Sequence, residues 1–362
     1  MVRKAVGASY AGVLSAYSGC QIGHSDTAEV AMAADVQRAN KMRILTLIAT
    51  IAVGGVVAAN AGQRAIRLKQ NPIIHAGMPH LEGGEASNID GPSLIRVPSW
   101  MGNALGKYYL YFAHHGGSYI RLAYANDLAG PWKIHPGGVL GRREAGFDDH
   151  IASPDVHVDE ATHRIVMYYH GWHSKFQDWV YQPTRVALSS DGLHFEPKEQ
   201  DLGDSYFRVF RWRSDCYALA RWGKVFRARS CAEPWTAAWE AGGNPFERPG
   251  EPLPRHVATL VEGDTLKVFY SRIGDAPEHL VMSTINLTPD WKNWRASEPV
   301  SVLEPVEPYE GGDLPIKASA RGPAMQRLRE LRDPAVYGEG NRRYLLYTVA
   351  GESGIAIAEL TK

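Results

Sequence analysis

The sequence carries no excess of charge of either sign. Among its 362 residues, Lys and Arg number 39 and Asp and Glu number 39, so the formal net charge is zero. A neutral chain has no overall basic field with which to attract nucleic acid or an anionic membrane surface. The chain also has no Walker loop, no Gly-x-Gly-x-x-Gly between strand and helix, and no His-Glu-x-x-His sequence. Nucleotide-phosphate binding, dinucleotide chemistry and zincin-type proteolysis therefore have no support.

Cysteine is scarce, with three residues in the whole chain. Cys20 precedes a long apolar run, and only Cys216 and Cys231 lie in the remainder. Two cysteines without nearby paired His or Cys do not make a zinc site. They flank Arg-Trp-Gly-Lys at 221–224, which is typical of a hairpin turn, so the pattern is compatible with a disulfide or with two buried thiols.

Long apolar runs are also absent, except for one near the N-terminus. Residues 44–63 are uncharged, follow Lys41 and Arg43, and contain Ala59-Asn60-Ala61 near their end. This pattern predicts a signal peptide over 42–61, a mature chain that begins at Gly62, and a periplasmic or extracellular location. Residues 1–41 are then interpreted as a disordered leader or as the result of a start codon assigned too early. A membrane anchor over 44–63 is the alternative, but its Gly, Ala and Thr content favours cleavage.

An aromatic strand pattern recurs along the rest of the chain. Asp155 precedes the alternating "VHV", a polar turn, the strand "RIVMYYHG" and a third strand "TRVALS". The same order follows Asp90, His256 and Asp333, and a version without a leading acid occupies residues 206–230. Five such units predict an all-β, five-bladed β-propeller over residues 62–362, because each unit must stack on its neighbours to bury both its faces.

The repeat also predicts a site. The first strand of every propeller blade lines the central axis, so residues at the starts of these strands converge at one mouth of the channel. Asp155 is unusual in a strand, where acids are depleted. We therefore expect the carboxylates of Asp90, Asp155 and Asp333 to gather at this mouth, with His256 beside them.

Three short segments carry a resemblance to known enzymes: "NIDGPSLI" around Asp90, "SPDVHVD" with "RIVMYYHG" in the second unit, and "RDPAVY" with Arg332 and Asp333. With them the chain resembles the five-bladed propeller glycoside hydrolases of families 43, 32 and 68. The resemblance implies a glycosidase in which the blade-one Asp is general base or nucleophile, a second Asp tunes it, and a Glu is the general acid. The Arg-Asp-Pro sequence comes last here, and no Glu-Cys follows it, which departs from families 32 and 68.

Residue by residue, the resemblance assigns Asp90 as base or nucleophile and Asp155 or Asp333 as the auxiliary carboxylate. Glu310, in "PYEGGDLPI", is the expected acid, because family 43 also has its acid in a Glu-Gly pair. His256 is the rival, since imidazole can also donate a proton. Cleavage of an acetal needs such an acid, together with a group that acts on the anomeric carbon or on its attacking water.

Further residues are expected to contact a carbohydrate substrate. The alternating arginines of the third unit would contact a carboxylate or sulfate, or else form a solvated face; Trp172 and Trp179 would form a stacking wall. Dispersed His, Asp and Glu indicate no catalytic metal or other cofactor, although a structural Ca²⁺ on the axis would be compatible with the fold. The expected substrate-binding residues are Asp333, Arg332, His256, His150, His170, Trp172 and Arg208, and the arginine row is Arg208, Arg211, Arg213, Arg227 and Arg229.

Two other functions share this fold. A non-catalytic sugar-binding propeller would keep the aromatic and arginine residues but would need no acid. A glycoside phosphorylase would need a phosphate site built from Arg and His, and its sugar phosphate product is best kept in the cytoplasm, which export would contradict. The three acids favour an enzyme.

Overall fold

The computed structural model describes residues 63–81, 88–176, 181–231, 233 and 235–361. The predicted leader (1–41) and signal peptide (42–61) lie outside this part of the chain, so their prediction is untested. Within the described residues, no helix has the length and apolar character needed to cross a membrane.

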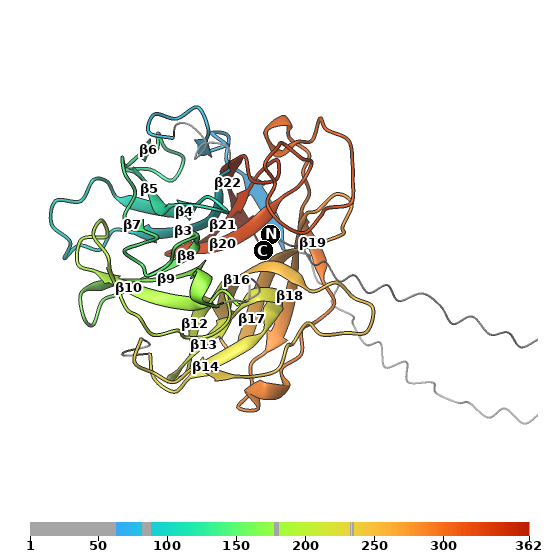
Figure 1. The fold of residues 1–362 in the computed structure, drawn as a ribbon. Coiled ribbons are helices and arrows are strands. Elements are labelled where there is room, and N and C mark those ends of the chain that lie inside the picture. Colours follow the sequence, from blue (N-terminus) through green and yellow to red (C-terminus); the bar gives the residue numbers. More distant parts are fainter. Residues whose placement is uncertain (1–62, 82–87, 177–180, 232, 234, 362) are drawn as a thin grey trace, which may run out of the picture. The chain divides into compact units, whose positions relative to one another are not determined.

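Five antiparallel sheets follow one another in the sequence, and each is one blade of a β-propeller (Figure 1). Blade one comprises β3 (Asp90–Arg96), β4 (Tyr108–Ala113), β5 (Tyr119–Ala125) and β6 (Lys133–Ile134), and β7 (Leu140–Gly141) also pairs with β5. Blade two comprises β8 (His150–Asp159), β9 (Arg164–Trp172), β10 (Thr184–Ser189) and β11 (Glu196–Pro197). Blade three comprises β12 (Arg208–Trp212), β13 (Asp215–Leu219), β14 (Val225–Ala228) and β15 (Glu240–Ala241).

Blade four comprises β16 (Pro254–Glu262), β17 (Thr265–Arg272), β18 (Leu280–Asn286) and β19 (Val300–Leu303). Blade five is built from both ends of the described chain. It comprises β20 (Arg332–Glu339), β21 (Arg342–Thr348), β22 (Gly354–Thr361) and β1 (Arg64–Arg67), and β2 (Ile74–His75) also pairs with β22. Because β1 supplies the outer strand of the last blade, it closes the ring. The predicted all-β, five-bladed fold is confirmed.

Short 3₁₀ turns connect some of these strands. They are η2 (Ser174–Phe176), η3 (Arg221–Gly223), η4 (Trp291–Asn293) and η5 (Pro308–Glu310).

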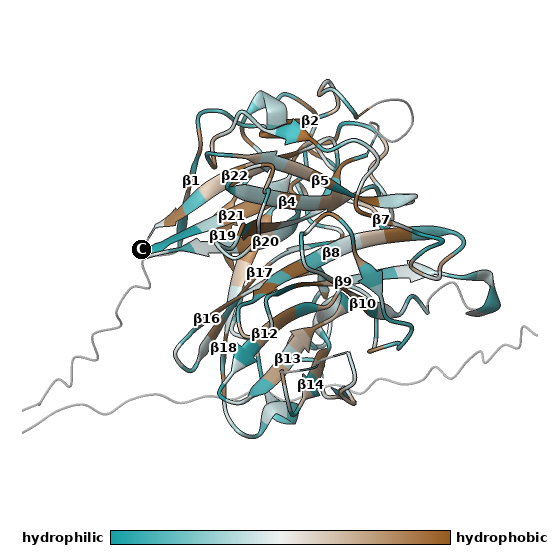
Figure 2. Cartoon of the chain, turned by 90° about the vertical axis from the view of Figure 1, so that its left-hand side faces the viewer, coloured by the Kyte–Doolittle hydropathy of each residue, from teal (hydrophilic) through white to brown (hydrophobic). Residues whose placement is uncertain are grey.

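The hydrophobic core lies between neighbouring blades, as expected for units that cannot bury both faces alone. Buried residues group into five clusters, and each draws on two adjacent blades. For example, Phe112 and Leu110 of blade one pack in one cluster with Leu346 and Ile357 of blade five. In Figure 2 the hydrophobic colouring follows the strands, whereas many connecting loops are hydrophilic.

The inner strands β3, β8, β12, β16 and β20 begin at one mouth of the axis, here called the upper mouth, and end at the lower mouth. Four of them carry a bulge near the start, at Asp90/Ser93, Ala152/Asp155, Pro254/Val257 and Arg332/Ala335. In blade one the bulge contains Gly91, with φ of 58°. A Cβ on Gly91 would lie 2.9 Å from the Cα of Ser153, so the close approach of β3 and β8 requires glycine here.

The bulges give a structural alignment of the blades that differs from the sequence repeat. Gly91, Ser153 and Asp333 occupy the same bulge position, with φ of 58°, 49° and 45°. Asp90 therefore lies one residue before this position, and Asp155 lies two residues after it. The expectation that Asp90, Asp155 and Asp333 occupy matching blade positions was wrong. The inserted residue of each bulge shifts the register of the strand, and the repeat pattern in the sequence does not mark where a bulge falls.

Candidate active site

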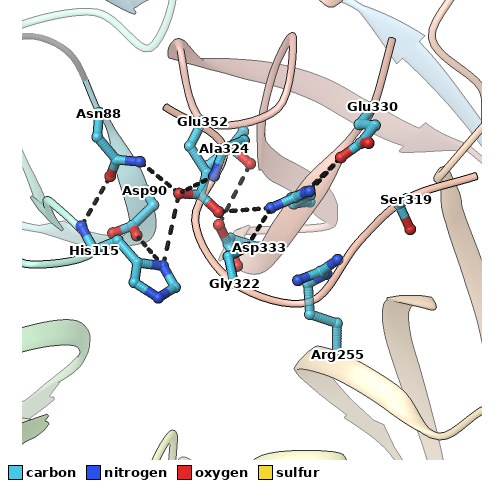
Figure 3. A network of polar contacts seen from close by, with 12 residues as sticks. Asn88, Asp90, His115, Arg255, Ser319, Gly322, Ala324, Glu330, Asp333 and Glu352 are labelled. Atoms are coloured by element: carbon cyan, nitrogen blue, oxygen red, sulfur yellow. Dashed lines mark hydrogen bonds and ion pairs between the residues drawn. The ribbon is translucent and has the colours of Figure 1, made fainter. Parts of the chain in front are cut away.

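Two carboxyl groups from different blades meet at the upper mouth. Asp90 begins β3 in blade one, and Glu352 lies in the turn between β21 and β22 of blade five. Their side chains and the imidazole of His115 each present one atom within 4.8 Å of the others (Figure 3). Both acids are almost fully buried, at 3% exposure for Asp90 and 1% for Glu352.

Hydrogen bonds hold the Glu352 side chain in place. Arg332 Nη1 donates to Glu352 Oε1 at 2.9 Å, and Asn88 Nδ2 donates to Oε2 at 2.5 Å. The backbone N–H of Ala324 also donates to Oε2, at 3.3 Å. The guanidinium and the two N–H donors therefore fix the orientation of this carboxyl group.

Asp90 has the opposite environment. Its Oδ1 is buried and has no hydrogen-bond partner among the described residues. Burial, reinforced by the negative charge of Glu352, raises the pKa of Asp90 to about 8. Asp90 is therefore protonated at neutral pH, and the pair consists of one carboxylic acid and one carboxylate.

Asp90, His115 and Glu352 also form a group that could face a cation. His115 Nδ1 lies 3.7 Å from both Asp90 Oδ2 and Glu352 Oε2, so two carboxylates and one imidazole face one another. Calcium prefers six to eight oxygen ligands, which this set does not supply. Both oxygens of Glu352 already accept protein hydrogen bonds, one of them from the Arg332 guanidinium. Two carboxyl groups and one imidazole thus supply fewer ligands than the axial Ca²⁺ that the sequence left open would take.

A buried ion network supports this mouth from blades four and five. Arg332 also donates to Glu330, by Nε at 2.8 Å and by Nη2. Arg255 binds Glu278 with two hydrogen bonds, of 2.7 and 2.9 Å, and Ser271 donates to the same carboxylate at 2.6 Å. Because these charges are paired, they position Glu352 without offering a free carboxylate of their own.

His256 forms the second chemical group of the upper mouth. It lies in β16, and its Nδ1 contacts Asp333 Oδ1 of β20. Burial, together with nearby Arg255, holds the pKa of His256 well below its usual range, so the ring is neutral at pH 7. With Nδ1 directed at Asp333, the lone pair resides on Nε2.

Tyr206 packs between two histidines beside this pair. Its ring centroid lies 4.1 Å from that of His256, with the planes 26° apart, and 4.1 Å from that of His170. The backbone of Tyr206 has φ of 65°, and that of Asp333 has φ of 45°. Such conformations are unfavourable for residues other than glycine and concentrate at functional sites. Burial raises the pKa of the Tyr206 hydroxyl.

Asp155 does not join this site. Its Oδ2 contacts His157 Nε2 at 2.8 Å and accepts from the Val209 N–H at 2.7 Å. Asp155, His157 and Arg208 line a cavity of about 490 Å³ at the lower mouth. Although burial acts to raise the pKa of Asp155, His157 and Arg208 hold it below its usual value. Asp155 is thus a paired carboxylate at the lower mouth of the channel, away from Asp90.

Arg208 separates the two mouths. Its Nη1 donates to Pro154 O at 2.6 Å, and its Nε donates to Val257 O at 3.3 Å. The guanidinium is buried, lies 3.6 Å from Asp155 Oδ1, and also acts electrostatically on Asp90. Arg208 is therefore held within the channel and is not the free sugar-contacting residue that the sequence predicts.

Glu310 is also remote from the predicted role. It is fully buried, and Arg67 of the outer strand β1 donates to it twice, at 2.8 Å from both Nε and Nη2. The Tyr347 hydroxyl and two backbone N–H groups complete its hydrogen bonds. Because every donor is internal, Glu310 fastens blade five rather than donating a proton to a substrate. The interpretation of Glu310 as the acid is corrected accordingly.

The remaining predicted residues divide between the site and the scaffold. His170 is buried beside Tyr206, and its Nδ1 has no partner within the described chain. His150 packs edge-on to His170 and contacts Asp149 at 2.7 Å. Trp172 is half-buried opposite His150 in the β8–β9 register. Trp179 lies outside the described residues.

The arginines of the third unit do not line up on one face of the sheet. Arg208 is on the axis, whereas Arg227 is paired with Asp215 at 2.7 Å through Nε. Arg211 donates to Cys231 O at 3.3 Å. The predicted single face therefore divides into separate structural contacts. Near it, Cys216 and Cys231 form a disulfide, which decides between the two alternatives that the sequence left open.

Sequence reasoning missed Glu352, Asn88 and Tyr206. The repeat drew attention to the first strand of each blade, but Glu352 lies in the turn between the second and third strands. Those turns also reach the upper mouth, because strand two returns antiparallel to strand one. An acidic residue in the short turn "AGESG" was the one available signal.

No family model matches this chain. The uncharacterized protein R118 of Acanthamoeba polyphaga mimivirus is 34% identical over 323 residues, which cover 82% of this chain and 90% of R118.

Solved structures with a similar fold include glycoside hydrolases. One is from the GH130 family of mannoside phosphorylases, which contains hydrolases of β-1,2-mannosidic linkages in Candida mannan; its TM-score is 0.57, at 12% identity, over 83% of this chain and 94% of that one. A glycosyl hydrolase from Bacteroides ovatus has a TM-score of 0.56, at 14% identity, over 83% and 94%. A GH43 β-xylosidase/α-arabinofuranosidase from a compost metagenome, in complex with xylotriose, has a TM-score of 0.54, at 13% identity, over 83% and 95%. The resemblance to propeller glycoside hydrolases is thus confirmed at the level of fold.

Proposed function

This chain belongs to the family of the mimivirus protein R118, and we propose that it is a glycoside hydrolase whose active site is the upper mouth of the propeller. One observation carries the proposal: Asp90 is a buried carboxyl group at the start of an inner strand, its Oδ1 accepts no hydrogen bond among the described residues, and the carboxyl group of Glu352 lies beside it. A scaffold acid would have both oxygens paired, as Glu310 has. Burial and the charge of Glu352 raise the pKa of Asp90, which suits it to donate a proton to a leaving oxygen.

The proposed reaction uses Asp90 as general acid and His256 as general base. Asp90 transfers its proton to the glycosidic oxygen as the bond to the anomeric carbon breaks. A water molecule attacks that carbon, and its proton passes to Nε2 of His256, whose Nδ1 contacts Asp333. The neutral His256 and the protonated Asp90 are the required states at pH 7, because their environments shift the two pKa values in opposite directions.

Neighbouring residues position these two groups. Burial and the negative charge of Glu352 raise the pKa of Asp90, and Arg332 holds Glu352 in place. Tyr206 fixes the plane of the His256 ring by stacking. In this proposal the assignment of Asp90 changes from base or nucleophile to acid, because a buried carboxyl with a raised pKa is the protonated member of the pair.

Supporting observations favour a carbohydrate as substrate. The fold is shared with glycoside hydrolases, one of them solved with xylotriose. The mouth offers aromatic and imidazole rings together with buried polar groups, which suits the apolar faces and hydroxyl edges of sugars.

The test is hydrolysis of a panel of plant, algal and microbial glycans and of nitrophenyl glycosides by residues 62–362, with Asp90→Asn as the matched variant. We expect wild-type turnover without added phosphate. Asp90→Asn should lose several orders of magnitude, and less of its rate on dinitrophenyl glycosides, whose leaving group departs without a proton. Cleavage that requires phosphate and yields a sugar phosphate would favour a phosphorylase. Sugar binding without cleavage would favour a lectin.

We also propose that the protein is exported after cleavage of residues 42–61. The disulfide between Cys216 and Cys231 supports an oxidising compartment. A mature chain that begins at Gly62 would retain all of β1, which closes blade five from Arg64 onward. N-terminal sequencing of protein from a secreting host should begin at or near Gly62. An intact chain in the membrane fraction would instead support the anchor.

A further inference from the structure

A second cavity opens beside the proposed active site. It has a volume of about 280 Å³ and is lined by residues that include Ser205, Arg221, Trp222, Lys224 and Leu253. Arg221 and Trp222 form η3, the turn between β13 and β14 of blade three. Turns between the second and third strands of a blade lie at the upper mouth, as does Glu352 in blade five.

This cavity shares a wall with the active site. Arg221 N donates to Ser205 O at 2.8 Å, and Ser205 directly precedes Tyr206, which stacks on His256. Arg221 also acts electrostatically on Tyr206 and on His170. A glycan bound at His256 and Asp90 could therefore extend over residues 205–206 into the cavity.

Trp222 is a half-buried residue with an unusual backbone conformation. Its φ is 62°, which a large side chain rarely adopts and which the surrounding structure must support. Two guanidinium groups lie over its ring, Arg221 at 4.2 Å and Arg321 at 5.5 Å from the centroid. Trp222 is half-buried and lines the cavity, so part of its flat apolar surface is available to a ligand.

The two arginines form no salt bridge among the described residues, although Asp204, which also lines the cavity, acts electrostatically on Arg221. Their neighbour Lys224, in contrast, is paired with Asp204 at 3.1 Å. Burial, and repulsion by Arg321, contribute to a lowered pKa for Arg221. Two guanidinium groups at one ring create a local positive charge, and guanidinium groups bind carboxylate and sulfate with charge-assisted hydrogen bonds.

We propose that the cavity lined by Arg221 and Trp222, with the Arg321 guanidinium over the Trp222 ring, is a subsite for a negatively charged sugar of the substrate, bearing a carboxylate or a sulfate ester. The inference rests on the proposed glycosidase function and names its substrate class. The sugar ring stacks against Trp222, and its acidic group accepts hydrogen bonds from the guanidinium groups. The anion site is distinct from the arginine row that the sequence suggests, of which Arg208, Arg211 and Arg227 have internal partners.

Direct binding to the full mature protein tests the proposal independently of catalysis. Calorimetry would use trigalacturonate, a sulfated disaccharide, uncharged xylotriose and inorganic phosphate. We expect at least one of the two acidic probes to bind about tenfold or more tightly than xylotriose, with affinity that falls as salt is raised. The two acidic probes distinguish a carboxylate from a sulfate.

Variants define the site. Arg221→Met and Arg321→Met remove the charge but keep a similar length, and each should weaken acidic-sugar binding by about tenfold. Arg213→Met is the matched control, because Arg213 also lies over a tryptophan of blade three, 4.4 Å from the Trp212 ring, but in the β12–β13 turn at the lower mouth. It should bind all probes as wild type does. Arg321 is exposed, so its variant keeps the test open if Arg221→Met fails to fold.

The outcomes separate this inference from the proposed function. Arginine-dependent binding of an acidic sugar without turnover would support the subsite and contradict the hydrolase. Hydrolysis of neutral glycans with no binding of either acidic probe would overturn the subsite and keep the hydrolase. Arginine-dependent binding of inorganic phosphate alone would also overturn it.

Discussion

Arg332 donates a hydrogen bond to Glu352 at 2.9 Å, and this contact holds Glu352 beside Asp90, the carboxyl group whose pKa is raised. The Glu352 side chain is thus anchored by a buried cation. Asp90, 3% exposed and without a partner for Oδ1, is the group that gains the proton. The chemistry of the mouth thus depends on an arginine that need not touch the substrate.

The pH dependence of stability should reveal the protonated Asp90. Its pKa is raised from 3.8 to about 8 in the folded protein, so between pH 4 and pH 8 the folded state binds the extra proton and stability falls as pH rises. Asp90→Asn lacks this group. The free energy of unfolding of Asp90→Asn should match that of wild type near pH 4. At pH 9 it should exceed the wild-type value by roughly a few kcal/mol, and the melting temperature should rise with it. Parallel wild-type and variant curves over this range would contradict a raised pKa.

The pH–rate profile should depend on Glu352. Loss of the Asp90 proton predicts that kcat/KM falls above about pH 8. Glu352→Gln removes the negative charge that reinforces the raised pKa, so the alkaline limb should move to lower pH. Glu330→Gln, which alters another Arg332 partner, is the control and should leave the limb closer to wild type. An unmoved limb in Glu352→Gln would show that the two carboxyl groups are not coupled.

His256 should behave as the base of a single displacement. His256→Ala should lose most of its turnover, and added azide should restore part of it, because azide attacks without needing a proton removed. The first sugar product should have an inverted anomeric centre by NMR, since no glycosyl-enzyme intermediate forms. Retention of configuration, or no effect of azide, would require another residue in this role.

Glu310 should matter for stability and not for chemistry. Glu310→Gln breaks a pair with Arg67 and leaves that guanidinium without its counter-charge, which should cost roughly 3 kcal/mol of the free energy of unfolding. Glu298→Gln is the control, since Glu298 is 81% exposed in its pair with Arg248 and should cost little. Denaturant titration measures both. If Glu310→Gln instead kept full stability and lost turnover, the acid role expected from the sequence would return.

Much of the fold could be predicted from the sequence. Alternation of apolar and polar residues, and aromatic second strands such as residues 164–172, are local signals, and their repetition predicted five stacked sheets. Asp90 was also found, because it begins an inner strand and needs only the blade order to reach the axis. The position of β1 in blade five was not predicted, since a four-residue strand carries little pattern of its own.

The candidate site could be predicted only in part. Asp155 has the same local context as Asp90, yet it lies at the lower mouth, because β8 bulges two residues before it. Glu310 resembled a catalytic Glu-Gly pair, but its burial against Arg67 arises from a strand 243 residues away in the chain. Glu352 lies in an ordinary turn and gave no repeat signal.

The sequence by itself determined the blade order, the aromatic cores and the presence of an acid at the start of β3, because strand periodicity and turn residues act over a few positions. Only the tertiary structure decided which acids meet, which of them is protonated and which arginines remain unpaired. Those properties depend on burial and on Coulomb interactions between segments such as 88–90, 115, 332 and 352, and the distances between these segments exist only after the ring closes.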